Sequence, residues 1–204
     1  MLLTDLMISD ALNASNFSSI TNKEIYQVFM SDLCPPKIVK ETGRDYRKVW
    51  RRLYTSVVES RPREILFMLI HNKLPIPERL FRISVKRDPY CETCLGAEIS
   101  DIEHFFCTCT NVSLLWTWTK NRVMTLVQSV GVTDWELLNL LFPHTQYETE
   151  VVWLISNYIW FVWENIMVKS ENVSYDKFFG YLTFKYRELQ VSSGLTFKRL
   201  DEFK

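Results

Sequence analysis

Four potential metal ligands lie close together near the middle of this 204-residue chain. They follow the pattern Cys-x2-Cys-x9-His-x4-Cys and are Cys91, Cys94, His104 and Cys109. Zinc takes thiolate and imidazole ligands in tetrahedral sites, and a site closed by four protein ligands is structural. The first two cysteines suit a single turn, and the nine-residue spacer is long enough to fold the chain back. We therefore predict a knuckle held by Zn²⁺, which supplies architecture and not catalysis.

The identity of the fourth ligand depends on the local helix geometry. Ligand pairs on the C-terminal side of zinc sites are commonly separated by about three to five intervening residues. Four residues lie between His104 and Cys109, inside this range, and two lie between His104 and Cys107, outside it. A continuous helix would instead favour Cys107, one turn after His104. Choosing Cys109 requires the helix to break near Thr108 and leaves Cys107 as a spare thiol. Buried cysteines also occur as small hydrophobic side chains, but four of them beside a histidine favour a metal.

Composition and periodicity both favour helices. The chain is 47% hydrophobic and 14% aromatic with only 5 Gly, and it has no alternating run typical of a strand. We predict a mainly α fold, a multi-helix array with a small embedded zinc knuckle. The expected helices span 21–33, 44–58, 63–72, 78–83, a short segment beginning near 104, 113–130, 133–142, 148–169 and 174–190.

Helix-start patterns support several of these boundaries. Capping boxes are expected at 21–24, 100–103 and 133–136, and Asn111 is expected to cap the helix after the knuckle. The resulting organisation is a loosely ordered tail (1–20), a basic helical region (21–89), the zinc knuckle (90–110) and a C-terminal helical region (111–204).

Charge is segregated along the chain although the total is +0. Residues 37–87 hold 14 Lys and Arg against 5 Asp and Glu, a balance of +9, and with 24 of each in the chain the remainder balances at −9. Such asymmetry is typical of a part that faces nucleic acid. Five bases are expected on the face of helix 44–58 opposite its apolar residues: Arg44, Arg47, Lys48, Arg51 and Arg52. The alternatives are an ordinary solvated face, or pairing of the basic and acidic regions inside the fold.

Other features bear on location and chemistry. Clustered cysteines suit a reducing compartment, and the N-terminal segment carries Asp5 and Asp10 without a basic leader, so we expect an intracellular protein of the nucleus or cytoplasm. The apolar run Val151–Trp163 is shorter than the roughly 20 residues of a membrane span, which favours a buried helix. There is no phosphate-binding glycine loop, paired-aspartate polymerase motif or nucleophile elbow, so no catalytic residue is predicted.

From about Ile25 to Trp118 the chain resembles the zinc-binding domain that follows the reverse transcriptase in LINE-type, non-LTR retrotransposon proteins. The resemblance is carried by the segments IYQVFM, KVWRRLY, PREILFMLIHNKLPIPERLFR, YCETC and EISDIEHFFCTCTNVSLLW. In the last segment, His104, Phe105, Phe106 and Cys109 precede a Leu-Trp pair as they do in the family. This match independently favours Cys109 as the fourth ligand.

The resemblance implies a zinc site and a role in binding template RNA or target DNA. It implies no enzyme activity, because the polymerase and endonuclease parts that carry catalysis in the family are missing from these residues. We expect a zinc-stabilised nucleic-acid-binding module with RNA or DNA as its partner and no membrane. The alternative is a helical adaptor that binds another protein and has lost the nucleic-acid role. The oligomeric state is left open.

Overall fold

The computed structural model describes residues 46–55, 57–94, 98–129 and 131–197. Within these ranges the chain is mainly helical, with an isolated β-bridge and no strand, so the predicted fold class is confirmed. The tail 1–20, the helix expected at 21–33 and Arg44 lie outside the described residues. The elements are α4 (Arg47–Leu53), α5 (Ser60–Ile70), α6 (Pro77–Arg82), the π-helix η1 (His104–Thr108), α7 (Ser113–Val127), α8 (Asp134–Leu138), α9 (Glu148–Trp163), the π-helix η2 (Glu164–Val168) and α10 (Tyr175–Ser193).

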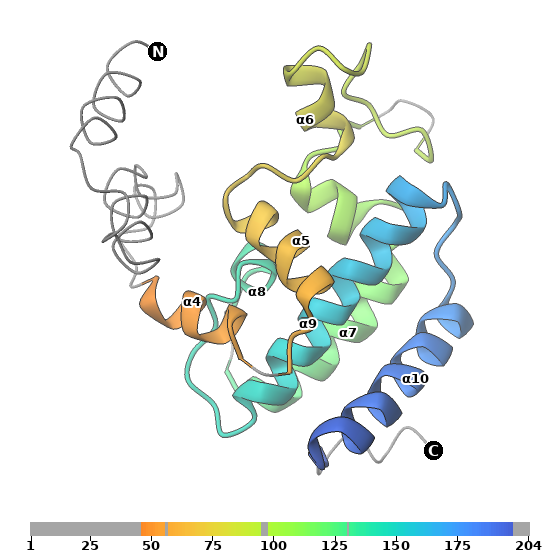
Figure 1. Cartoon of the computed structure of the whole chain (residues 1–204). Helices are drawn as coiled ribbons and strands as arrows, with labels where there is room; N and C mark the ends of the chain where they lie inside the picture. Colours follow the sequence, from red (N-terminus) through yellow and green to blue (C-terminus); the bar gives the residue numbers. More distant parts are fainter. Residues whose placement is uncertain (1–45, 56, 95–97, 130, 198–204) are drawn as a thin grey trace, which may run out of the picture.

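Helix α9 is the centre of the fold. It packs against α5 and α7 on two sides and also contacts α4, α8 and α10 (Figure 1). Most of its side chains are buried, and the buried apolar residues from Tyr46 to Phe197 form one core. The run Glu148–Val168 is long and apolar enough to cross a membrane by length and composition, but 67% of its apolar window is buried within the fold. The expectation of a buried core helix is confirmed.

Helix α4 is shorter than the periodicity predicts, and a side chain from α5 explains where it ends. Arg63 donates hydrogen bonds from Nε to the Leu53 carbonyl at 3.2 Å and from Nη2 to the Val58 carbonyl at 2.6 Å. These carbonyls would otherwise lack partners once the chain leaves the helix. The turn between the helices is therefore fastened from α5, which begins at Ser60 with Pro62 in its first turn.

The predicted capping residues are right at one described position and wrong at two. Thr133 forms a complete capping box with Glu136 at the start of α8. Before η1 the cap is Asp101, whose Oδ1 accepts from the His104 amide at 2.8 Å, because the backbone of Ser100 is bonded to Pro89 and Glu78 instead. Asn111 does not cap α7: its Oδ1 accepts from the Val173 amide at 3.2 Å and ties the segment before α10 to the knuckle.

Candidate metal centre

A short antiparallel bridge brings the first two cysteines to the centre. Tyr90 pairs with Ile99, and the Cys91 amide donates to the Glu98 carbonyl at 2.9 Å. The bridge lies between α6 and η1 and carries Cys91 on one arm, with Cys94 in the turn that follows. The fold-back expected from the spacer is therefore present.

The π-helix η1 supplies His104, and Cys109 follows directly after it; its geometry distinguishes Cys109 from Cys107. The Cys109 amide donates to the His104 carbonyl at 2.9 Å, a five-residue step that closes one wide turn. Cys109 itself is extended, with φ −57° and ψ 136°, so the helix ends at Thr108 where the choice of Cys109 requires a break. The wide turn places Cys109 with His104 in the ligand cluster, which does not include Cys107.

The distances in the cluster fit a tetrahedral zinc site. The Sγ atoms of Cys91 and Cys109 are 3.7 Å apart, and those of Cys94 and Cys109 are 3.8 Å apart. Zinc–sulfur bonds of about 2.3 Å meeting at tetrahedral angles put neighbouring sulfurs about 3.8 Å apart. One ligand atom from each of Cys91, Cys94, His104 and Cys109 lies within 4.8 Å of the others. The four predicted ligands are brought together in a geometry that one cation can occupy.

The imidazole of His104 is held in an orientation that leaves one nitrogen for a metal. Its Nδ1 lies 2.6 Å from Oε2 of Glu98 and 3.3 Å from Oγ1 of Thr108. Its Nε2 is buried and has no hydrogen-bond partner. Metal-binding histidines commonly donate their second nitrogen to a carboxylate, which fixes the tautomer and the ring. Buried polar atoms without a partner are energetically costly. A cation bound at Nε2 would provide the missing partner.

The thiols would not ionise together without a positive charge. Hydrogen bonds from Thr110 lower the pKa of Cys94 to about 7, whereas burial and the neighbouring sulfurs raise the pKa of Cys109 to about 12. A divalent cation reverses this balance, because a coordinated thiol is deprotonated outright. Burial also raises the pKa of Cys107, which is therefore an inert thiol.

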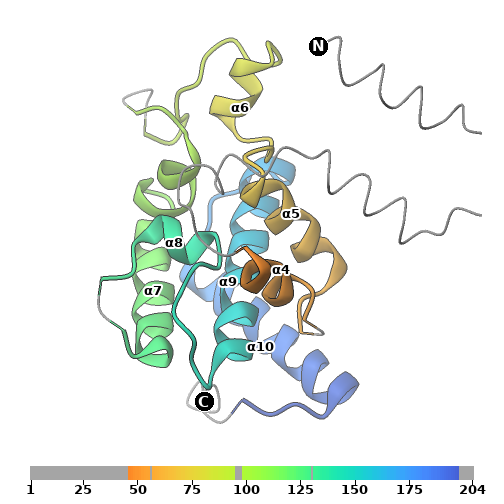
Figure 2. The same ribbon diagram turned by 90° about the vertical axis from the view of Figure 1, so that its left-hand side faces the viewer.

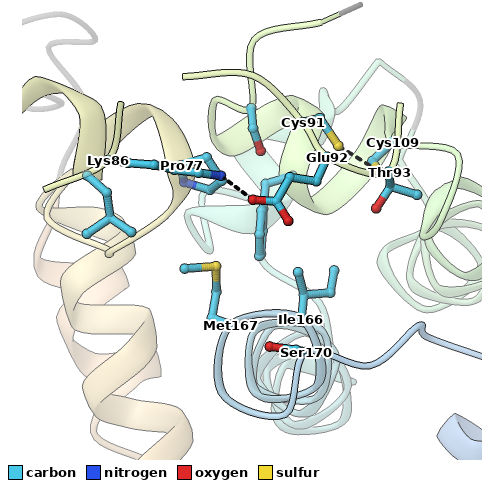
Figure 3. Close-up of a pocket in the computed structure, with 12 residues that line it drawn as sticks. Pro77, Lys86, Cys91, Glu92, Thr93, Cys109, Ile166, Met167 and Ser170 are labelled. Carbon is cyan, nitrogen blue, oxygen red and sulfur yellow. Dashed lines mark hydrogen bonds and ion pairs between the residues drawn. The ribbon is translucent and has the colours of Figure 1, made fainter. Parts of the chain in front are cut away.

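A cavity of about 280 Å³ adjoins the cluster and lies between it and η2, which continues α9. Cys91 and Cys109 line one wall, and Ile166 and Met167 of η2 face them from the opposite wall (Figure 3). At one side Lys86 and Glu92 form an ion pair of 2.8 Å. Cys91 and Cys109 are buried, and they also border this partly apolar hollow.

The knuckle is anchored to α9 through a buried tyrosine. The hydroxyl of Tyr158 donates to the carbonyl of Phe106 in η1, and the ring packs on Trp116 with centroids 5.2 Å apart. Tyr158 is fully buried, and burial raises its pKa well above the ordinary value, so the hydroxyl keeps its proton. This bond fastens the π-helix to the central helix.

Replacing Tyr158 by phenylalanine should therefore destabilise the zinc-loaded protein. The Phe106 carbonyl would be left buried without a donor, which costs roughly 1–3 kcal/mol. Thermal unfolding measures the effect, with Tyr175→Phe as the control because that ring is 46% exposed. Equal melting temperatures for the two variants would contradict a role for this bond.

The basic residues predicted to face nucleic acid do not share one environment. Arg47, Lys48 and Arg51 are exposed on α4. The prediction for Arg52 is wrong: its side chain is 2% exposed and donates to the Leu140 carbonyl at 2.6 Å, the Phe142 carbonyl at 2.9 Å and Glu148 at 2.9 Å. Arg52 lies beside the apolar face of α4. Its buried guanidinium is satisfied by acceptors that are distant in the sequence. The exposed basic face is smaller than predicted.

Sequence reasoning did not identify the residues that support the ligands. Glu98 and Thr108 contact His104, and Thr110 Oγ1 lies 3.5 Å from the Sγ of Cys94. Each is near a ligand in the chain, but Glu98 reaches the histidine only through the register of the bridge. Thr108 and Thr110 adjoin Cys109 in the chain, and Glu98 lies four residues after Cys94. A polar residue this near a ligand is a weak sequence indication, and none of the three stands out without the fold.

Residues 21–116 match the model of a protein family described as zinc-binding in reverse transcriptase. The matched part contains all four candidate ligands and the exposed bases of α4. No curated protein and no solved structure matches the chain. The zinc-binding part of the predicted resemblance is thus confirmed for this segment.

Proposed function

We propose that the chain is a zinc-stabilised nucleic-acid-binding module related to the LINE-type, non-LTR retrotransposon reverse transcriptases, and that it helps to hold template RNA or target DNA. It would act inside the cell, in the nucleus or cytoplasm, without catalysis of its own. The observation that carries the proposal is the closed cluster of three sulfurs and one imidazole within the segment that matches the zinc-binding family.

The metal's proposed role is structural. Cys91, Cys94, His104 and Cys109 would hold Zn²⁺ through three thiolates and one nitrogen, which completes a tetrahedron and leaves no position for a substrate. When bound, the ion supplies folding free energy and no reaction chemistry. The ligands come from the bridge after α6 and from η1 before α7, so their closure would fix how the two halves of the fold dock.

The proposed contact with nucleic acid begins on α4. Arg47, Lys48 and Arg51 are exposed within two turns of one helix, and no acidic residue lies on that helix. Exposed bases of this kind bind phosphates without reading the base sequence. Because bound phosphates release counterions, the affinity should fall steeply as salt is raised.

Reversing these three charges should weaken nucleic-acid binding. We expect Arg47→Glu, Lys48→Glu and Arg51→Glu together to lower the affinity about tenfold or more, and to reduce the slope of log affinity against log salt by about three. The measurement is a salt titration of the zinc-loaded full chain with labelled RNA and DNA.

The control should change the net charge equally at another site. Lys169→Glu, Lys177→Glu and Arg187→Glu meet this need, since they lie after α9 and on α10. Equal losses for the two triple variants would show a general charge effect and remove α4 as the binding surface. A wild-type affinity that does not change with salt would contradict the proposed function.

An exposed apolar patch favours a second candidate, the protein-interaction adaptor. Phe81, Ile83 and Val85, at the end of α6 and just beyond it, are 45%, 50% and 69% exposed. Neighbouring exposed apolar side chains are typical of a surface that binds protein. In the salt titration this candidate predicts no affinity for RNA or DNA and an unchanged zinc content.

A further inference from the structure

Three aromatic rings, from α4, from α5 and from the residue that ends α5, form one cluster at the surface. Trp50 lies 5.8 Å from Phe67 and 5.5 Å from His71, and the rings of Phe67 and His71 are 4.3 Å apart. The two helices contact each other and lie side by side in Figure 2. We call Trp50, Phe67 and His71 the aromatic cluster.

The aromatic cluster is not part of the fully buried core. Phe67 is 39% exposed, and Trp50 and His71 are half-buried. Phenylalanine usually lies inside a protein, and a single exposed ring needs no explanation. Three rings in mutual contact that all keep exposed area form a continuous aromatic surface, which favours a partner with flat faces.

Exposed basic side chains lie close to this surface along the chain. Arg47 and Arg51 lie three residues before and one residue after Trp50, and both are exposed on α4. Burial lowers the pKa of His71, and the charge of the nearby Lys73 lowers it further. Glu64 is the acid on α5; it is exposed and lies one turn before Phe67. The charge around the rings is complementary to a polyanion.

We propose that the aromatic cluster stacks unpaired bases while Arg51 and Lys73 bind the adjoining phosphates, so that the module's ligand is single-stranded nucleic acid. Single-strand binding proteins combine these two elements, aromatic rings for the bases and a basic surface for the backbone. In a duplex the faces of the nucleobases are stacked and hidden. A duplex would therefore contact only the basic side chains of α4. This inference rests on the proposed function and adds to it the strand state and the residues that contact bases.

Phe67→Leu tests the inference because it keeps an apolar side chain at a partly exposed position and removes the ring. The zinc-loaded full chain is titrated with a fluorescent thymidine 20-mer, with an abasic strand of the same length and with a duplex. We expect Phe67→Leu to weaken binding to the thymidine strand roughly five- to hundredfold, the range for one lost stacking contact. Binding to the abasic strand should not change, because that strand offers phosphates alone.

Phe184→Leu is the matched control, since Phe184 is an exposed ring on α10 and is 58% exposed. His71→Leu is the second test variant and should weaken the same strand and spare the abasic one. An equal effect of Phe67→Leu on both strands, or no effect on either, would overturn base stacking while leaving phosphate binding by α4 intact. Failure of the wild type to bind any of the three probes would overturn the proposed function and this inference with it.

Discussion

Cys109→Ala is expected to abolish stoichiometric zinc binding and to lower the melting temperature of the protein, whereas Cys107→Ala retains the metal. The Sγ of Cys109 lies 3.7 Å and 3.8 Å from the other two sulfurs of the cluster, so its loss opens the tetrahedron. Zinc in small structural sites contributes on the order of 10–16 kcal/mol, and removing one of four ligands forfeits much of it. The knuckle should then separate from α9.

The measurement is metal content after gel filtration, combined with thermal unfolding in the presence and absence of a chelator. A chelator should lower the melting temperature of the wild type and of Cys107→Ala, and change that of Cys109→Ala little. Cys107 is a fair control because it is 4% exposed, lies two residues away and also belongs to the core. If Cys107→Ala lost the zinc and Cys109→Ala kept it, the assigned ligand set would be wrong.

The ligand cluster could be predicted from the sequence because its information is local. Spacing alone places Cys91 and Cys94 on one turn and favours Cys109 over Cys107. Spacing does not predict the π-helix, which brings Cys109 and not Cys107 to His104. Its five-residue bond from the Cys109 amide to the His104 carbonyl is stabilised from outside, by Tyr158 on a helix about fifty residues later in the chain.

The exposed basic face was predicted only in part, because helical periodicity carries only local information. Helical periodicity correctly puts Arg47, Lys48 and Arg51 in solvent. It cannot show that Arg52 has buried acceptors, because these lie 88 to 96 residues away in sequence. One ion pair joins the basic and acidic regions here, between Arg52 and Glu148, while the other bases of α4 remain exposed. Helix type and the apolar face are local properties, but the partner of a buried charge is not.

Arg52→Met should be strongly destabilising. Its guanidinium satisfies the carbonyls of Leu140 and Phe142, pairs with Glu148 and lies 3.8 Å from the ring centroid of Phe142. Methionine preserves much of the side-chain length but leaves the Leu140 and Phe142 carbonyls without this donor and removes the cation that pairs with Glu148. Breaking a buried pair in this way costs roughly 3–5 kcal/mol. Urea unfolding of the zinc-loaded protein measures the loss.

Glu148, the acidic partner of Arg52, makes the free energy of unfolding depend on pH. Burial raises the pKa of Glu148, but the hydrogen bond and charge of Arg52 outweigh it and leave the pKa below its ordinary value of 4.5. A lowered carboxylate pKa contributes stability above the unfolded value and loses it as the pH falls through the folded value. The difference in unfolding free energy between the wild type and Glu148→Gln should therefore shrink as the pH falls below about 4.5.

Arg51→Met is the control that separates the two neighbouring arginines. An exposed substitution should change the unfolding free energy by no more than about 0.5 kcal/mol. In the nucleic-acid titration the order should reverse: Arg51→Met weakens binding, and Arg52→Met keeps the wild-type affinity at temperatures where it is folded. Because Arg52 is 2% exposed, its charge serves the fold and is not available to phosphates. Weakened binding by folded Arg52→Met with little loss of stability would show that its side chain reaches solvent after all.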